Sequence, residues 1–138
     1  MPSEEERRKL DDELRAKKLQ LIEYTRSMAQ RYLFEENYQR AIPGAMTSLK
    51  LSMDMFGLKS VELVPSYLLL GEASQGLENY VQAQEYLSQA EWTVIKNENC
   101  PLIILSKLHR NIAMLQMAQG QFDEALRNLA NDVIFIFI

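Results

Sequence analysis

Cys100 and His109 are the residues of this chain whose side chains could do nucleophilic chemistry, since they are its single cysteine and single histidine. A thiol and an imidazole can form a nucleophile–base pair, but one cysteine and one histidine cannot complete a tetrahedral zinc site. The sequence contains no Gly-x-Gly-x-x-Gly or Walker loop for a nucleotide. We therefore expect a protein that is not an enzyme and has no catalytic residues, metal or cofactor. Cys100 is expected to be a loop thiol, and His109 a helix side chain.

The overall charge is nearly balanced. With 15 Lys and Arg and 19 Asp and Glu residues, the 138-residue chain has a formal net charge of −4, so no strong positive field favours nucleic acid or an anionic membrane. A single cysteine allows no internal disulfide and fits a reducing compartment. The chain shows neither a signal-peptide pattern nor an apolar run of about 18 residues. These features predict a cytoplasmic protein without a nucleic-acid or membrane partner.

The helices that would position any functional residue are predicted from a repeat in the sequence. Similar residues recur 42 positions apart, as Tyr38, Tyr80 and Phe122 do, and this spacing is here called the repeat step. Aromatic residues recur at this step, and so do small residues that would let two helices approach closely. The repeat-defining residues are Tyr38, Tyr80 and Phe122, then Ala41, Ala83 and Ala125, then Ala29, Gly71 and Ala113. A fixed period of this kind is typical of a helical repeat array. We therefore predict an all-α fold of three helical hairpins.

The predicted organisation is a long charged N-terminal helix over residues 1–24, followed by repeats at 25–57, 58–99 and 100–138. Each repeat is expected to contain two helices. Pro43 lies inside the second helix of the first repeat, where a proline predicts a kink or a late helix start. Trp92, the only tryptophan, is expected to pack between repeats.

Both ends of the chain carry apolar stretches outside the repeat pattern. Near the N-terminus a narrow stripe, interrupted by Lys17, consists of Leu10, Leu14, Leu21, Tyr24 and Met28. It fits either a lead-in helix that runs straight into the first repeat or a short coiled-coil seam for a partner. The last six residues, Val133 to Ile138, have no polar side chain. They are expected either to fold back on the array or to recruit another molecule, for example by self-association.

The second repeat resembles the tetratricopeptide repeat family. The match is carried by Tyr67, Leu70, Gly71, Tyr80, Ala83, Leu87 and Ala90. The resemblance implies a right-handed superhelix in which the first helices of the repeats line a groove. The usual period of that family is about 34 residues, so a period of 42 implies about two extra helical turns per unit or longer connections.

Several runs are similar to the repeat region of the MYND-zinc-finger tetratricopeptide proteins of motile cilia and sperm flagella. They are SVELVP at 60–65, YLLL at 67–70, QAQEYL at 82–87, LHRN at 108–111 and LAND at 129–132. This resemblance implies a scaffold of the ciliary or flagellar axoneme, with another ciliary tetratricopeptide-repeat protein and inner-arm dynein components as partners. The family's zinc finger needs many cysteines, and the N-terminus here has none. The zinc site is therefore not carried over.

The first helices of the repeats are predicted to form a partner-binding groove lined by Arg26, Gln30, Leu68, Glu72, Lys107, Arg110, Met114 and Met117. Its mixed apolar and basic character fits a helix or an extended segment of a protein partner, because methionines adapt to a bound shape. The alternative is a chaperone-type adaptor that binds acidic peptide tails. Tetratricopeptide domains of that kind use Lys, Asn, Asn, Lys and Arg at positions that here hold Arg26, Gln30, Leu69, Lys107 and Asn111. Only Lys107 agrees in type, so a non-catalytic binding scaffold is favoured.

Overall fold

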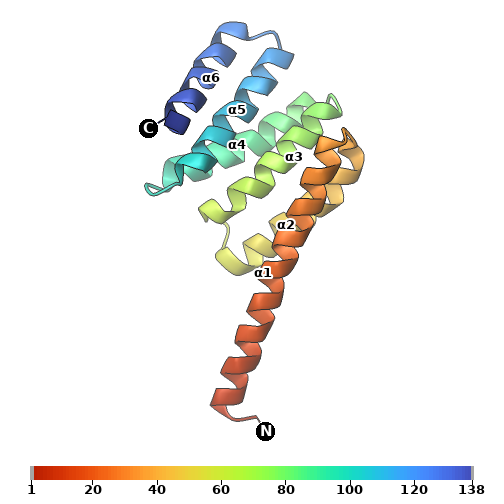
Figure 1. Cartoon of the computed structure of the whole chain (residues 1–138), viewed down its shortest axis with the longest axis vertical. Coiled ribbons are helices and arrows are strands. Elements are labelled where there is room, and N and C mark those ends of the chain that lie inside the picture. The colour runs from red at the N-terminus through yellow and green to blue at the C-terminus, as the bar shows by residue number, and fades with distance from the viewer. Residues whose placement is uncertain (1, 138) are drawn as a thin grey trace.

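The computed structural model describes the backbone of residues 2–137 and the side chains of residues 2–131. Its elements are α1 (Glu4–Phe34), α2 (Tyr38–Phe56), the short 3₁₀ helix η1 (Val61–Leu63), α3 (Val64–Gly76), α4 (Tyr80–Lys96), α5 (Leu102–Ala118) and α6 (Phe122–Phe137). No strand occurs in the described range, so the predicted all-α class is confirmed. No helix of that range is long and apolar enough to cross a membrane. The helices pack chiefly as the pairs α1–α2, α3–α4 and α5–α6, which follow one another in chain order (Figure 1).

The three hairpins share one turn geometry. A residue with positive φ lies two positions before the start of each second helix: Glu36 at 59°, Glu78 at 61° and Gly120 at 79°. The amide of the next residue then donates to a carbonyl five positions earlier, from Asn37 to Tyr32 at 2.8 Å, from Asn79 to Ser74 at 2.9 Å and from Gln121 to Gln116 at 2.7 Å. The repeat step of the sequence is thus also a repeat of backbone geometry.

Local sequence explains where the helices begin. Ser3 and Glu6 form a capping box at the start of α1, because each side chain accepts a hydrogen bond from the backbone amide of the other, both at 3.2 Å. α2 begins at Tyr38, ahead of Pro43, so the late start expected from this proline is not observed. Pro65 lies in the first turn of α3, where a missing amide leaves no helical hydrogen bond unmade.

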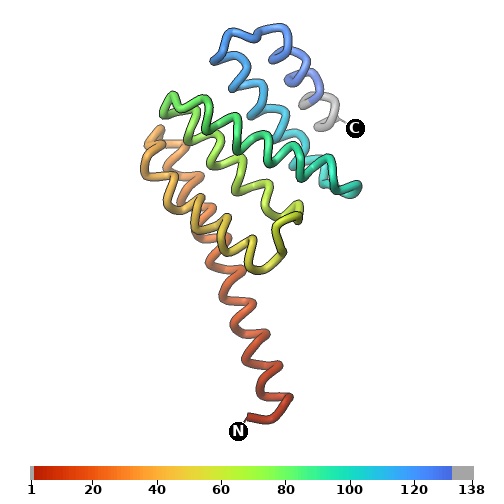
Figure 2. Tube along the Cα trace, turned by 180° about the vertical axis from the view of Figure 1, so that it is seen from behind, coloured from red at the N-terminus to blue at the C-terminus, as the bar shows by residue number. Residues whose placement is uncertain are grey.

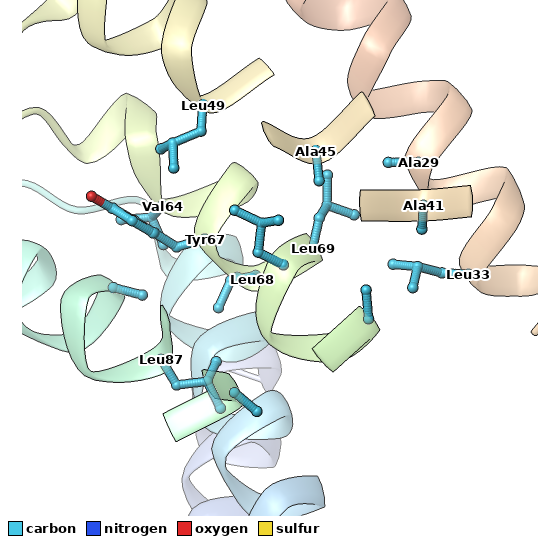
Figure 3. Close-up of a cluster of buried hydrophobic side chains, with 14 of the residues drawn as sticks. Ala29, Leu33, Ala41, Ala45, Leu49, Val64, Tyr67, Leu68, Leu69 and Leu87 are labelled. Carbon is cyan, nitrogen blue, oxygen red and sulfur yellow. The ribbon is translucent and has the colours of Figure 1, made fainter. Parts of the chain in front are cut away.

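α3 lies at the centre of the hydrophobic core. It is buried at positions 64, 66–71, 73 and 74, which cover all sides of the helix. It contacts α1, α2, α4 and α5. Figure 3 shows Leu68 and Leu69 of α3 in one cluster with Leu33 of α1, Ala45 of α2 and Leu87 of α4. The middle hairpin therefore holds its neighbours together.

Small residues lie where helices approach most closely. The five repeat-defining alanines, at positions 29, 41, 83, 113 and 125, are fully buried. A Cβ atom added to Gly71 would lie 3.0 Å from Leu87 Cδ2 and 3.8 Å from the carbonyl oxygen of Ala83. A Cβ atom added to Gly76 would overlap the ring of Tyr38 in the preceding hairpin. Glycine at these two positions lets α3 pack closely against both α2 and α4.

Trp92 does not pack between repeats, so that prediction is wrong. Its side chain is 60% exposed. The buried face of α4 carries Ala83, Leu87 and Ala90, and position 92 projects from another side of the helix. Lys96 Nζ lies 4.5 Å from the centroid of the Trp92 ring, an exposed cation–π contact.

The two ends of the chain differ from the repeats between them. α1 runs as one helix from Glu4 to Phe34, so the charged lead-in continues directly into the first hairpin. Phe122 is 61% exposed, because no described helix packs over it as α3 packs over Tyr38. The apolar run at residues 133–138 lies outside the described side chains. Self-association through it stays a prediction.

Candidate functional site

A groove of about 450 Å³ opens between α1, α3 and α5, the first helices of the three hairpins. It is lined by Arg26, Ser27 and Gln30 of α1, by Pro65, Leu68, Leu69 and Glu72 of α3, and by Ile104, Lys107, Arg110, Asn111 and Met114 of α5. Seven of the eight predicted groove residues are brought together here. Met117, the eighth, does not line the groove.

Equivalent positions of the three hairpins line this groove. Nine of its residues fall into three columns related by the repeat step: Arg26, Leu68 and Arg110; Gln30, Glu72 and Met114; Ser27, Leu69 and Asn111. The third column was not predicted as part of the groove, although two of its members entered the comparison with chaperone-binding domains. Applying the repeat step to Ser27 would have found it. Pro65 and Ile104 were also missed.

Arg26 is held by three hydrogen bonds on the α1 side of the groove. Its Nε donates to Ser66 Oγ at 3.1 Å, and its Nη2 donates to Ser52 Oγ at 3.1 Å and to the carbonyl oxygen of Glu62 at 2.6 Å. Burial lowers the pKa of Arg26, and the negative charges of Glu62 and Glu23 oppose that effect. An arginine stays protonated under such a shift. Arg26 thus links α1 to α2 and α3, with much of its donor capacity used inside the chain.

Glu72 places an unpaired negative charge in the groove. Its carboxylate is half-buried on α3 and makes no hydrogen bond or salt bridge with another described residue. Burial raises the pKa of Glu72, because removal of water disfavours the charged form. A cation or a hydrogen-bond donor from a bound molecule would relieve this cost.

The α5 side of the groove combines charge with apolar surface. Lys107 and Arg110 are exposed there, and Met114, which also lines the groove, follows Arg110 one helical turn later. Asn111 Nδ2 donates to the carbonyl oxygen of Lys107 at 2.9 Å, while its buried Oδ1 has no hydrogen-bond partner among the described atoms. A buried acceptor without a donor is costly. A ligand that donates a hydrogen bond to Asn111 Oδ1 would therefore stabilise the α5 side of the groove.

The residues considered for nucleophilic chemistry have separate partners. The Cys100 thiol, in the loop before α5, donates to the carbonyl oxygen of Pro101 at 3.8 Å, and burial raises its pKa. A raised pKa disfavours the reactive thiolate. His109 Nδ1 lies 2.9 Å from Asn128 Oδ1, in a contact between α5 and α6. Neither contact joins Cys100 to His109.

In the part of the chain that the structure describes, no three His, Cys, Asp or Glu side chains are grouped so that they could hold a metal ion. No protein-family model matches the chain. The described residues form three helical hairpins with no strand, and a mixed-charge groove runs along the first helices of these hairpins.

Replacement of Glu72 by glutamine is expected to stabilise the free protein at neutral pH. Because the pKa of Glu72 is raised in the folded state, the folded state binds more protons than the unfolded state between the ordinary glutamate pKa of about 4.3 and the raised pKa. The free energy of unfolding therefore falls as the pH rises from the ordinary pKa through the raised one. Glu72→Gln removes this loss. Thermal melting from pH 4 to 8 should show a stability gain that grows with pH. Glu91→Gln, at an exposed position, is the control. A Glu72→Gln variant no more stable than wild type at pH 7 would contradict the expectation.

Proposed function

We propose that this chain is a non-catalytic protein-binding scaffold whose groove holds a helix or an extended segment of a partner. The observation that carries the proposal is that equivalent residues of three successive hairpins line one groove. Repeat proteins build extended binding surfaces in this way. The shared turns and the tetratricopeptide-like residues also support a right-handed superhelical arrangement of the hairpins.

The chemistry of the groove fits a segment with apolar side chains and charges of both signs. Leu68, Leu69 and Met114 supply apolar surface, and the methionine can adjust to the bound shape. Lys107 can pair with an acidic side chain of the partner, and Glu72 with a basic one. An amphipathic helix or an extended peptide can present such groups at matching intervals.

The proposed setting is the axoneme of a motile cilium or flagellum. This part of the proposal rests on the runs at 60–65, 67–70, 82–87, 108–111 and 129–132, which are similar to those of ciliary MYND-zinc-finger tetratricopeptide proteins. The partners in that setting would be another ciliary tetratricopeptide-repeat protein and inner-arm dynein components. The role would be assembly of the complex.

A chaperone-type adaptor is the weaker proposal. Its groove would have to hold several carboxylates of an acidic tail, and the unpaired Glu72 would repel them. Arg26 already donates to three groups of its own chain. We expect no binding of a synthetic acidic peptide that ends in a free carboxylate. Binding that disappears when this carboxylate is amidated would favour the adaptor instead.

Two matched methionine variants test the groove. Met114→Glu places a charge in the groove, and Met117→Glu makes the same change on the same helix outside it. Each full-length chain is used to capture proteins from an extract of ciliated cells, followed by mass spectrometry and by affinity measurement with the purified partner. Met114→Glu should weaken binding by about tenfold or more, because it replaces an apolar contact with the partner by a charge. Met117→Glu should bind like wild type. Equal binding by both variants would contradict the proposal.

A further inference from the structure

The N-terminal part of α1 extends beyond the three hairpins (Figures 1 and 2). The first buried residue of α1 is Ile22, so residues 4–21 form about 27 Å of helix with little cover. Most of the stability of a helix in a protein comes from tertiary packing of its apolar face, and this part of α1 has little such packing. This segment therefore gains if another helix packs against it.

One face of α1 has the spacing of a coiled coil. The face, here called the seam, consists of Leu10, Leu14, Lys17, Leu21, Tyr24 and Met28, at alternating intervals of four and three residues. In heptad terms the first, third and fifth of these are d positions, and the others are a positions. Its apolar side chains range from 37% exposed at Met28 to 64% exposed at Leu10. No described element of the chain covers them.

We propose that the seam pairs with the seam of a second copy of this chain as an antiparallel coiled coil. Positions e face each other in such a pair, and Asp11 and Lys18 both occupy e positions beside the seam. A register with Leu10 opposite Leu21 of the second copy pairs the first four seam residues of the two chains, leaves Tyr24 and Met28 beyond the paired segment, and brings Asp11 next to Lys18 of the second copy. Two-fold symmetry forms this ion pair twice. Neither residue has a salt bridge within its own chain among the described residues.

The core of this register tolerates its one charged member. Lys17 falls opposite Leu14 of the second copy, where its aliphatic stem can cover the leucine while the ammonium group reaches water. A single polar residue in a coiled-coil core also fixes register and orientation. Lys17 thus favours one alignment over the others.

A parallel pair fits these residues less well. In register, it would place Lys17 against Lys17 in the core and would bring Glu6 near Asp11 at the flanking positions. Like charges at such positions oppose pairing. Only Glu13 with Lys18 would form an attractive contact. The charges therefore select the antiparallel orientation.

Two leucine variants test whether the seam dimerises the full-length chain. The seam is short, so the dimer should be weak and should dissociate on dilution. Leu10→Glu places a charge in the seam opposite Leu21 of the second copy and is expected to raise the dissociation constant of the dimer by about tenfold or more. Leu19→Glu makes the same change on the opposite side of α1 and should leave the constant unchanged. Sedimentation equilibrium over a concentration series measures both. A wild-type chain that stays monomeric, or association that persists equally in both variants, would overturn the proposal.

Charge-swap variants test the orientation. Lys18→Glu should weaken the dimer, because it faces Asp11 of the second copy, and adding Asp11→Lys should restore the wild-type dissociation constant. Rescue by Glu13→Lys in place of Asp11→Lys would indicate a parallel pair and overturn the antiparallel assignment. Failure of both rescues would overturn the charge pairing itself. Circular dichroism of each variant checks that the helices remain formed.

Discussion

Replacement of Arg26 by leucine is expected to lower the free energy of unfolding by about 2–4 kcal/mol. The substitution keeps part of the apolar stem but removes the donors to Ser52 Oγ, Ser66 Oγ and the carbonyl oxygen of Glu62. Both serines are buried, so their hydroxyl groups would lose a partner that water cannot easily replace. α1 would also lose its polar link to α2 and α3. Chemical denaturation followed by circular dichroism measures the loss.

Two controls separate this network from the general effect of removing a surface arginine. Arg40→Leu changes an exposed arginine on α2 for which no hydrogen bond is found among the described residues, and it should alter stability by less than about 0.5 kcal/mol. Ser66 Oγ also lies 2.8 Å from Ser48 Oγ, so the network continues into the core. Arg26→Leu combined with Ser66→Ala should therefore cost clearly less than the sum of the two single variants. An Arg26→Leu variant as stable as Arg40→Leu would show that the network contributes nothing.

Replacement of Ala83 by leucine is expected to destabilise the fold by about 1–3 kcal/mol. Ala83 is fully buried where α4 meets α3, and its carbonyl oxygen lies 3.8 Å from the position that a Cβ atom of Gly71 would occupy. A leucine has no room at this contact, so α3 and α4 would have to separate. The thermal melting temperature should fall accordingly.

The matched control for this overpacking is Ala130→Leu, the same substitution at a less buried position of α6. It should leave the melting temperature nearly unchanged, because no described side chain has to move. If both alanine variants melted at the wild-type temperature, the close contact of α3 with α4 would not limit the packing of the middle hairpin.

The hairpins themselves could be predicted from the sequence. The aromatic residues at the repeat step, Tyr38, Tyr80 and Phe122, each begin the second helix of a hairpin. These helix starts could be predicted because they depend on nearby residues: a turn with one positive φ angle, followed by an aromatic residue and a small residue at a fixed distance. These local features recur at the repeat step in all three hairpins.

The groove was predictable in part for the same reason. Its three columns of residues follow the repeat step. The same step could have shown that the prediction of Met117 as a groove residue was wrong. The positions equivalent to Met117 are Leu33, which is buried, and Gln75, and neither lines the groove. Three residues turn a helix by about 300°, so Met117 lies about 60° round α5 from Met114 and about 4.5 Å farther along it, outside the residues that line the groove.

Long-range contacts could not be predicted from the sequence. Arg26 looked like a free groove cation, and nothing near it in the chain indicates Ser52 and Ser66 as its partners. They lie on two other helices and meet the guanidinium only when the hairpins pack. Trp92 was assigned by residue type alone, whereas its exposure depends on which side of α4 faces the neighbouring helices.

The binding role of the groove is tested most directly by site-specific photocrosslinking. A photoreactive amino acid is placed at position 114 in one full-length chain and at position 117 in another, each is irradiated in an extract of ciliated cells, and the crosslinked proteins are identified. A groove that holds a partner segment predicts one discrete crosslinked protein from position 114, strongly reduced when Leu68 is replaced by glutamate in a chain that still folds. Position 117 should give no such product. A discrete product from position 117, with none from position 114, would contradict the account.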